Sequence, residues 1–498
     1  MERTLHYCTN LGETGLSVII PDMRFSFCFV AIAFLSAALY AQAPVPTPVL
    51  YSEATVRNME HVRDAALKSD YALTRTAFMT NNIGPRLSGS AQAQRAVEYV
   101  ADEMRKLGLE VRLQRIMVPH WVRGTESGEL VEFPGMAPGT TQKIVLTALG
   151  GSVATPESGL TAEVVVVNNY DELNRLGRSG VEGKIVLFNA KFDRELADSG
   201  FGTQAYGQAV QYRGGGAVAA GRLGAVAVLV RSAGGSQNRL AHTGSTRYAD
   251  DVPKIPAAAV SNEDAETIAY LASMGKVRSK LILTPRTLPD APSYNVIADL
   301  KGSERPDEVV IVSGHLDSWD LGTGALDDAS GVAVSMQVPF LLSQLKIRPK
   351  RTIRVVAYMN EENGLVGGTE YAKEQGLQIS KHFAAIESDL GASHTLGILF
   401  TGKPEIQTYL VPISNVLGAH GAGLVQNQPG GVGADIGPLT QKGVPSFAPW
   451  FDMRTYFNYH HTAADTFDKI DPKDLAKLGS VMAVLAYGLA DLERPLPR

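Results

Sequence analysis

Apolar residues recur along the chain with two periods, and each period predicts a different kind of element. A spacing of three to four residues predicts an amphipathic helix over 50–80 and a second helix over 91–107 that ends at Gly108. One face of the first helix carries Val56, Met59, Val62 and Ala66. Over 110–118 apolar and polar residues instead alternate, which predicts a strand.

The pattern changes between residues 125 and 288. This segment is rich in Gly, Ala and Val, and three short apolar runs over 163–167, 184–188 and 225–230 predict strands. It contains little candidate chemistry. We interpret it as a β-rich domain inserted into the chain.

After Pro292 predicted strands alternate with predicted helices. The strands cover 309–313, 353–358 and 383–386, and the helices cover 330–345 and 369–375. This alternation predicts an α/β fold with a mostly parallel, mixed sheet flanked by helices.

The first 43 residues read as a leader. An apolar run over 25–40 is shorter than the ~20 residues of a membrane span, and Ala41-Gln42-Ala43 follows it as a cleavage-site pattern. We predict a signal peptide and a secreted or periplasmic protein that does not contact the membrane once the leader is removed. An uncleaved anchor is the alternative. The predicted organisation is a leader over 1–43, main-domain parts over 44–124 and 289–498, and the inserted domain over 125–288.

Charge and cysteine content narrow the chemistry. The chain has 498 residues, a formal net charge of -5 and no long basic run, so we expect no nucleic-acid partner. Both cysteines, Cys8 and Cys28, lie in the predicted leader. A mature chain without cysteine has no disulfide and no thiolate metal site, so any metal must be held by His, Asp and Glu.

Ionisable residues gather where the predicted strands end. They are His315 and Asp317, Asp327 and Asp328, Glu361 and Glu362, and Asp389. Ligands bind at the carboxyl ends of strands in open α/β sheets, and a buried carboxylate cluster needs a cation. Imidazole with carboxylate suits zinc, with manganese and cobalt as the alternatives. A catalytic zinc usually has three protein ligands, so five ligands are too many for one ion. Two zincs that share one carboxylate would each have three, and the sequence therefore predicts two zincs ~3.5–4 Å apart.

Each signal also has a structural interpretation. The pair Asp327-Asp328 could cap the following helix, and Glu361-Glu362 could be a solvated acidic pair. No Gly-x-Ser-x-Gly or His-Glu-x-x-His motif occurs, which argues against a serine hydrolase and a thermolysin-type protease.

Five segments, taken together, resemble the metal motifs of the dizinc exopeptidases, a family that includes bacterial leucyl-type aminopeptidases and glutamate carboxypeptidases. The segments are Ser313-Gly314-His315-Leu316-Asp317, Gly324-Ala325-Leu326-Asp327-Asp328, Asn360-Glu361-Glu362-Asn363-Gly364, Glu387-Ser388-Asp389 and His461-Thr462-Ala463-Ala464-Asp465. They occur in the family's order. The resemblance covers about 55–120 and 290–490, and the insertion resembles the family's protease-associated domain.

The resemblance implies two zinc ions per chain. His315 and Asp389 would bind one, Glu362 and His461 would bind the other, and Asp327 would bridge both.

The resemblance also implies roles around the metals. Glu361 would be the general base acting on a hydroxide between the zincs, and Asp317 would hold the His315 ring. A cis peptide would join Asp327 to Asp328. His460 and Asp435 are candidate substrate contacts.

The expected function is hydrolysis of a terminal peptide bond of a dipeptide or short peptide. The alternatives are a non-catalytic binding protein on a peptidase fold, and a single-metal deacylase or glutaminyl cyclase. The resemblance also makes a homodimer plausible. Amino- and carboxypeptidase activity stay open, with Asp435 and Arg454 as candidate end-binding residues and Tyr456 and Tyr459 as candidate oxyanion stabilisers.

Overall fold

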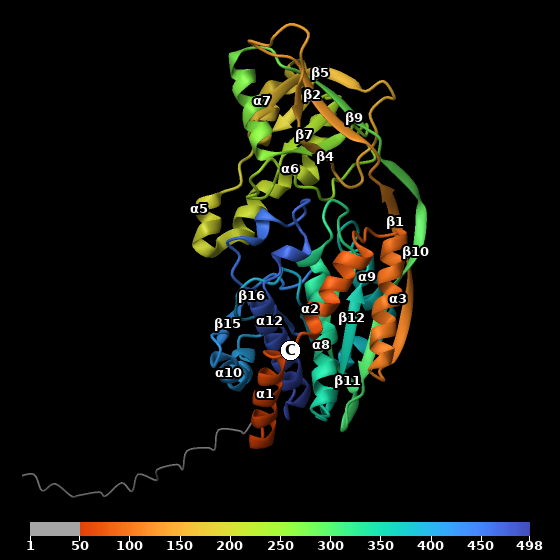
Figure 1. Cartoon of the computed structure of the whole chain (residues 1–498), viewed down its shortest axis with the longest axis vertical. Coiled ribbons are helices and arrows are strands. Elements are labelled where there is room, and N and C mark those ends of the chain that lie inside the picture. Colours follow the sequence, from red (N-terminus) through yellow and green to blue (C-terminus); the bar gives the residue numbers. More distant parts are fainter. Residues whose placement is uncertain (1–49) are drawn as a thin grey trace, which may run out of the picture. The chain divides into compact units, whose positions relative to one another are not determined.

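The computed structural model describes residues 50–498, and the predicted leader lies outside them. Two eight-stranded sheets organise these residues (Figure 1). We call the segment from Glu126 to Leu283, which forms the whole second sheet, the insert, and the remaining described residues the main part.

The sheet of the main part is mixed and carries the predicted parallel strands at its centre. Its order is β1 (Glu110–Val122), β10 (Arg286–Leu300), β12 (Arg351–Tyr358), β11 (Arg305–His315), β13 (His382–Glu387), β16 (Ser446–Phe451), β14 (Thr395–Thr401) and β15 (Leu424–Asn427). Strands β12, β11, β13 and β16 run parallel to one another, and β14 pairs parallel with β15. The pairs β1–β10, β10–β12 and β14–β16 are antiparallel. The predicted mixed, mostly parallel sheet is confirmed.

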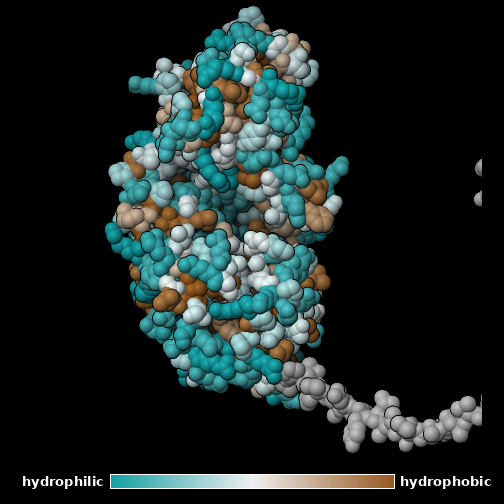
Figure 2. Space-filling view, turned by 180° about the vertical axis from the view of Figure 1, so that it is seen from behind, coloured by the Kyte–Doolittle hydropathy of each residue, from teal (hydrophilic) through white to brown (hydrophobic). Residues whose placement is uncertain are grey.

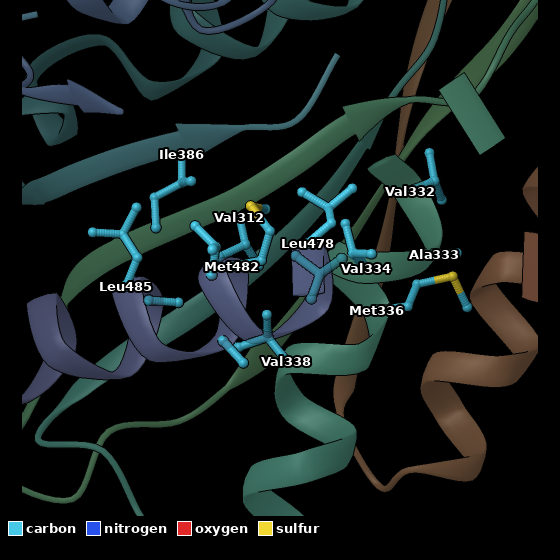
Figure 3. Close-up of a cluster of buried hydrophobic side chains, with 14 of the residues drawn as sticks. Val312, Val332, Ala333, Val334, Met336, Val338, Ile386, Leu478, Met482 and Leu485 are labelled. Atoms are coloured by element: carbon cyan, nitrogen blue, oxygen red, sulfur yellow. The ribbon is translucent and has the colours of Figure 1, made fainter. Parts of the chain in front are cut away.

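Helices cover this sheet on both faces. They are α1 (Glu53–Ala66), α2 (Tyr71–Ala77), α3 (Ala91–Lys106), α8 (Ser330–Gln344), α9 (Val366–Gln375), α10 (Ile406–Gly418), α11 (Gly437–Thr440) and α12 (Pro472–Asp491). Figure 3 shows side chains of α8, α12 and the central strands in one buried cluster, in which Met482 lies beside Val312 and Leu485 beside Ile386. Both helices are apolar around most of their circumference because other elements surround them. Each fully buried Val, Leu or Met stabilises the fold by about 1.5–3 kcal/mol.

The insert holds more helix than its predicted β-rich character implies. Its sheet has the order β3 (Gln142–Ile144), β2 (Glu126–Glu132), β9 (Arg278–Leu283), β5 (Leu160–Val167), β6 (Ile185–Phe188), β7 (Ala227–Arg231), β8 (Ala257–Val260) and β4 (Leu146–Ala148). Its helices are α4 (Tyr170–Val181), α5 (Arg194–Leu196), α6 (Gly202–Arg222) and α7 (Asn262–Met274). The spacing of apolar residues does not predict helix α6, because Gly and Ala supply much of its buried face.

Two further elements differ from the sequence prediction. The single helix expected over 50–80 breaks between α1 and α2, where the Ser69 hydroxyl accepts a hydrogen bond from the Tyr71 N–H and so competes with the helical pattern. Strand β10 was not predicted. Its first half is largely exposed and contains Pro289 and Pro292, which hide the strand pattern.

The surface shows no dominant hydrophobic area on the face in Figure 2, where brown residues lie in small groups among teal ones. Within residues 50–498, no helix has the length and apolar character to span a membrane. The expected homodimer stays a prediction.

Candidate active site

Three parallel strands deliver the candidate residues to one edge of the main sheet. Strand β11 ends at His315, β12 ends three residues before Glu361, and β13 ends two residues before Asp389. The register sets His315 opposite Tyr358 and Ser313 opposite Glu387, so the three ends lie side by side. The predicted convergence is therefore confirmed for these strand ends.

Asp327 lies between two groups of side chains and presents one carboxylate oxygen to each. Its Oδ1 is 2.9 Å from His315 Nε2, which is also 3.1 Å from Asp389 Oδ1. Its Oδ2 is 3.2 Å from His461 Nε2, which is 2.9 Å from Glu362 Oε2. The two groups, His315–Asp327–Asp389 and Asp327–Glu362–His461, each have ligand atoms within 4.8 Å of one another.

Backbone carbonyls orient both histidine rings. His315 Nδ1 lies 3.0 Å from the Asp317 carbonyl oxygen, and His461 Nδ1 lies 3.3 Å from that of Thr243. A carbonyl only accepts, so the Asp317 carbonyl places a proton on His315 Nδ1 and leaves Nε2, which faces Asp327, as the nitrogen that would bind a metal. The His461 Nδ1 atom also lies 3.3 Å from Arg213 Nη1, which only donates, so a donor and an acceptor both face this nitrogen.

The Asp317 carboxylate serves a different contact from the one predicted. Its Oδ1 is 3.9 Å from His315 Nδ1, so the ring is held by the Asp317 backbone. The carboxylate instead accepts hydrogen bonds from the backbone N–H groups of Asn360 (2.7 Å) and Glu361 (3.1 Å) and from the Ser88 hydroxyl (2.9 Å). Asp317 therefore positions the segment that carries Glu361.

The loop that carries Asp327 is held from both sides. The Asp465 carboxylate accepts the N–H groups of residues 325, 326 and 327, and the Asp328 carboxylate accepts the N–H groups of His315 and Gly331. The peptide bond between Asp327 and Asp328 is cis, as the sequence resemblance implied. Asp328 thus supports the site through backbone contacts rather than as part of either group around Asp327.

The site carries strong opposing charges in the metal-free chain. Burial lowers the pKa of His461, but Glu362 and Asp327 outweigh it and raise this pKa to about 9. Burial and the neighbouring Asp327 charge raise the pKa of Glu362 to about 7. For Asp327 burial acts upward, yet the neighbouring His315 and His461 rings hold the pKa well below its ordinary value.

The donor set fits zinc. Two imidazoles and three carboxylates converge, and Asp327 Oδ2 is buried without a hydrogen-bond partner among the described residues. Protonated histidines are the counter-charges available to this cluster when no metal is bound, and Zn²⁺ with neutral imidazoles provides the same compensation.

Glu361 faces the open side of this cluster. Burial, followed by the nearby Asp389 charge, raises its pKa well above the ordinary value. Within residues 50–498 no side chain makes a hydrogen bond or ion pair with its carboxylate, and Glu361 lines the cleft described next. A carboxyl group held there can accept and return a proton.

A cleft of about 640 Å³ opens over the two groups and is walled by both parts of the chain. From the main part it is lined by residues that include Asp327, Glu361, Glu362, Asp389, Tyr456, His460 and His461. From the insert it is lined by residues that include Gly150, Thr203, Tyr206, Arg213, Ser245, Thr246 and Arg247. The interpretation that the insert carries little candidate chemistry was wrong, because residues of the insert line the cleft. A local sequence pattern does not reveal which residues of a folded chain lie close together in space.

Two hydrogen bonds fix the insert against the site. The Thr243 N–H donates to the His461 carbonyl at 2.9 Å, and the Ser245 hydroxyl donates to the Glu362 carbonyl at 3.0 Å. The insert therefore contacts the backbone of His461 and Glu362, whose side chains form one of the two groups around Asp327.

His460 and His242 form a contact that sequence reasoning missed. His460 lines the cleft, and its Nδ1 lies 3.1 Å from Nε2 of His242 in the insert. His242 was interpreted as structural because no motif surrounds it. The His-His dipeptide at 460–461 was the available signal, but its partner became visible only in three dimensions.

The remaining predicted residues lie apart from the cleft or at its wall. Asp435 is buried with both carboxylate oxygens unpartnered within the described chain, and it does not line the cleft. Arg454 is exposed and pairs with Asp452. Tyr456 lines the cleft, whereas Tyr459 does not.

Comparison with known proteins agrees with this geometry. Residues 295–486 match peptidase family M28, and residues 150–268 match the PA domain. Carboxypeptidase Q of Homo sapiens is 39% identical over 426 residues, which cover 85% of this chain and 86% of that protein. The crystal structure of a peptidase M28 precursor from Shewanella amazonensis SB2B has 37% identity and a TM-score of 0.83, covering 89% of this chain and 99% of that one. A zinc aminopeptidase from Bacillus subtilis has the same fold at 22% identity and a TM-score of 0.61, over 86% of this chain and 98% of that one.

The fold is that of a peptidase with an inserted PA domain, and residues of that domain line the cleft. The chain belongs to peptidase family M28.

Proposed function

We propose that this peptidase is a two-zinc exopeptidase that hydrolyses a terminal peptide bond of a dipeptide or short peptide. The observation that carries the proposal is the geometry of Asp327, whose two carboxylate oxygens lie 2.9 Å and 3.2 Å from the Nε2 atoms of His315 and His461. One carboxylate between two such groups suits a pair of metals better than a single ion.

In this proposal His315 and Asp389 hold one zinc, Glu362 and His461 hold the other, and Asp327 is shared. Zinc bound there would supply Lewis acidity, which polarises a substrate carbonyl and lowers the pKa of a water molecule.

Glu361 performs the proton transfers. Its carboxylate accepts a proton from the attacking water and then gives a proton to the departing amine. Asp317 keeps Glu361 at the cleft because it binds the Glu361 N–H and that of the preceding residue.

The cleft supports a short substrate. Its volume of about 640 Å³ lies within the ~300–1,000 Å³ of small-molecule sites. The similarity to carboxypeptidase Q supports an exopeptidase that acts on peptides. We also propose that the chain is secreted, that it has the domain boundaries predicted from the sequence, and that it forms a homodimer.

Metal content and hydrolysis test the proposal together. We expect about two zincs per purified, zinc-loaded chain by elemental mass spectrometry, with hydrolysis of unblocked dipeptides. Asp327→Asn should lower the zinc content and abolish hydrolysis, whereas Asp102→Asn, an exposed residue on α3, should change neither. One zinc with hydrolysis would favour a single-metal enzyme. No zinc and no hydrolysis would leave a binding protein.

A further inference from the structure

We propose that His460 donates a hydrogen bond to the carbonyl oxygen of the scissile bond as negative charge develops there, and that His242 of the insert fixes the tautomer this requires. The inference rests on the proposed function and adds a catalytic residue, His460, and a positioning residue, His242. It also gives the insert a role in the reaction itself.

His460 presents one ring nitrogen to the cluster around Asp327. Its Nε2 lies 3.5 Å from Asp327 Oδ2, the same oxygen that His461 Nε2 faces at 3.2 Å. The first distance is longer than an ordinary hydrogen bond, so His460 Nε2 stays available to a ligand. Because His460 lines the cleft, a substrate carbonyl held at this cluster lies within reach of that nitrogen.

The contact with His242 determines which nitrogen of His460 carries the proton. Both rings are buried, and burial disfavours a charged imidazole, so each ring carries one proton. His460 Nδ1 lies 3.1 Å from His242 Nε2. One of these two nitrogens therefore donates to the other, which must be unprotonated.

Two observations make His242 the donor. If His460 were protonated on Nδ1, His242 would be protonated on its own Nδ1, which is buried without a hydrogen-bond partner within residues 50–498. Proteins rarely bury an N–H group that has no acceptor. The same arrangement would turn the lone pair of His460 Nε2 toward the Asp327 carboxylate, which repels it. The opposite arrangement places an N–H on His460 Nε2, facing the cleft.

Neighbouring rings hold His460 in this orientation. Its ring stacks on that of His461, with centroids 3.6 Å apart and 17° between the planes. Tyr206 of the insert and Phe457 pack edge-on at centroid distances of 5.2 Å and 5.3 Å, and Tyr456 lies at 5.0 Å. The donor is therefore in place before substrate binds, which is the condition for effective stabilisation of a developing charge.

A neutral imidazole N–H suits this step. During hydrolysis the water oxygen bonds to the carbonyl carbon, and the carbonyl oxygen becomes negative before the C–N bond breaks. The hydrogen bond from His460 strengthens as this charge grows, so it favours the transition state over the bound substrate. The proton stays on His460, because Glu361 performs the proton transfers of the proposed function.

Substitutions that keep a ring test the donor in the zinc-loaded enzyme. His460→Phe keeps the packed ring but has no N–H. We expect kcat for a dipeptide to fall by about 100–1,000-fold, with KM within about threefold of the wild type. Zinc content should stay at the wild-type value, since His460 belongs to neither group around Asp327. The matched control is His61→Phe, at an exposed histidine on α1, which should change none of these values.

A second pair of variants tests the positioning residue. His242→Phe should lower kcat by about 10–100-fold, as loss of a partner that fixes a histidine tautomer usually does. The amide N–H of His242→Gln can still donate to His460 Nδ1, so its kcat should lie closer to that of the wild type. If His460→Phe does not fold, the comparison of these two variants carries the test.

Nitrogen-15 NMR of histidine-labelled protein provides a readout other than activity, with and without zinc. His242 and His460 should each be protonated on Nε2 and not on Nδ1, with their signals assigned by their loss in the two Phe variants. A proton on His460 Nδ1 would overturn the inference.

The kinetic outcomes separate this inference from the proposed function. If the loaded wild type hydrolyses no peptide, the proposed function fails. If it is active and His460→Phe keeps the wild-type kcat, or loses only in KM, the inference fails and the proposed function stands. A loss of kcat in Tyr456→Phe with none in His460→Phe would assign the role to Tyr456 and overturn the inference in the same way.

Discussion

The Asp465 carboxylate binds the backbone of Asp327. Its two oxygens accept three consecutive N–H groups, those of Ala325 at 3.0 Å, Leu326 at 2.7 Å and Asp327 at 3.2 Å. Burial and the nearby Asp327 charge raise the pKa of Asp465 to about 7. One side chain from the His461 loop therefore sets the direction in which Asp327 presents its own carboxylate.

We expect Asp465→Asn to weaken zinc binding by about 10–100-fold, as loss of a residue that supports metal ligands usually does. The amide keeps one oxygen acceptor but replaces the other with a donor that faces backbone N–H groups. Competition with a chelator of known affinity measures the change. Asp468→Asn, an exposed position in the same loop, should leave zinc affinity unchanged. Equal zinc affinity in the wild type and Asp465→Asn would contradict the supporting role.

Glu361→Gln should lower kcat by about 10²–10⁴-fold, because the amide cannot accept a proton. Zinc content should stay at the wild-type value, since Glu361 belongs to neither group around Asp327. Steady-state hydrolysis and elemental analysis of the same sample check both points. Glu98→Gln, an exposed substitution on α3, is the control. Loss of zinc from Glu361→Gln would instead place this residue among the ligands.

Arg86 is fully buried and joins the turn before α3 to the site loops. Its guanidinium donates to the carbonyls of Leu316 at 2.9 Å, Thr323 at 2.7 Å and Gly324 at 2.9 Å. Arg86→Lys keeps a charge but cannot reach these acceptors with one nitrogen.

We therefore expect Arg86→Lys to reduce the free energy of unfolding by at least about 2 kcal/mol, because buried carbonyls lose their donors. Urea denaturation of the zinc-free protein measures this without a contribution from metal binding. Arg95→Lys on the exposed face of α3 should change the value by less than about 0.5 kcal/mol. Equal free energies of unfolding for Arg86→Lys and Arg95→Lys would contradict this prediction and would show that water replaces the lost donors.

His382 makes stability depend on pH, and it does not line the cleft. Burial, and to a lesser degree the Arg354 and Arg498 charges, lowers its pKa from 6.5 to about 4. The ring is 2.9 Å from the Tyr371 hydroxyl. As pH falls below 6.5 the unfolded chain binds a proton that the folded chain does not, so folding loses up to about 3 kcal/mol by pH 4.

We expect the free energy of unfolding to fall less at acid pH in His382→Gln than in the wild type. Between pH 7.5 and 5 the decrease in unfolding free energy should be smaller by about 2 kcal/mol in the variant. Denaturation at both pH values tests this, with His61→Gln, an exposed histidine on α1, as the control. Parallel pH profiles for the wild type and His382→Gln would show that His382 does not contribute.

Local patterns were enough for the centre of the main part. The strands that end at His315, Tyr358 and Glu387 are apolar runs bounded by turns, so residue type and local pattern were sufficient to predict them. The edge strand β10 was missed for the opposite reason. Its pairing with β1 compensates for two prolines and an exposed face, and such pairing is a long-range property.

The sequence by itself determined the family, the order of the motifs and the strand ends at which acids and histidines gather, because these depend on residue type and short spacing. Only the tertiary structure decided how Asp327 divides its oxygens between His315 and His461, and how the Thr243 carbonyl orients the His461 ring. It also decided that the insert lines the cleft with Arg213 and Arg247. These contacts join residues more than 100 positions apart in most cases, and hydrogen bonds and ion pairs act over a few ångströms of space rather than along the chain.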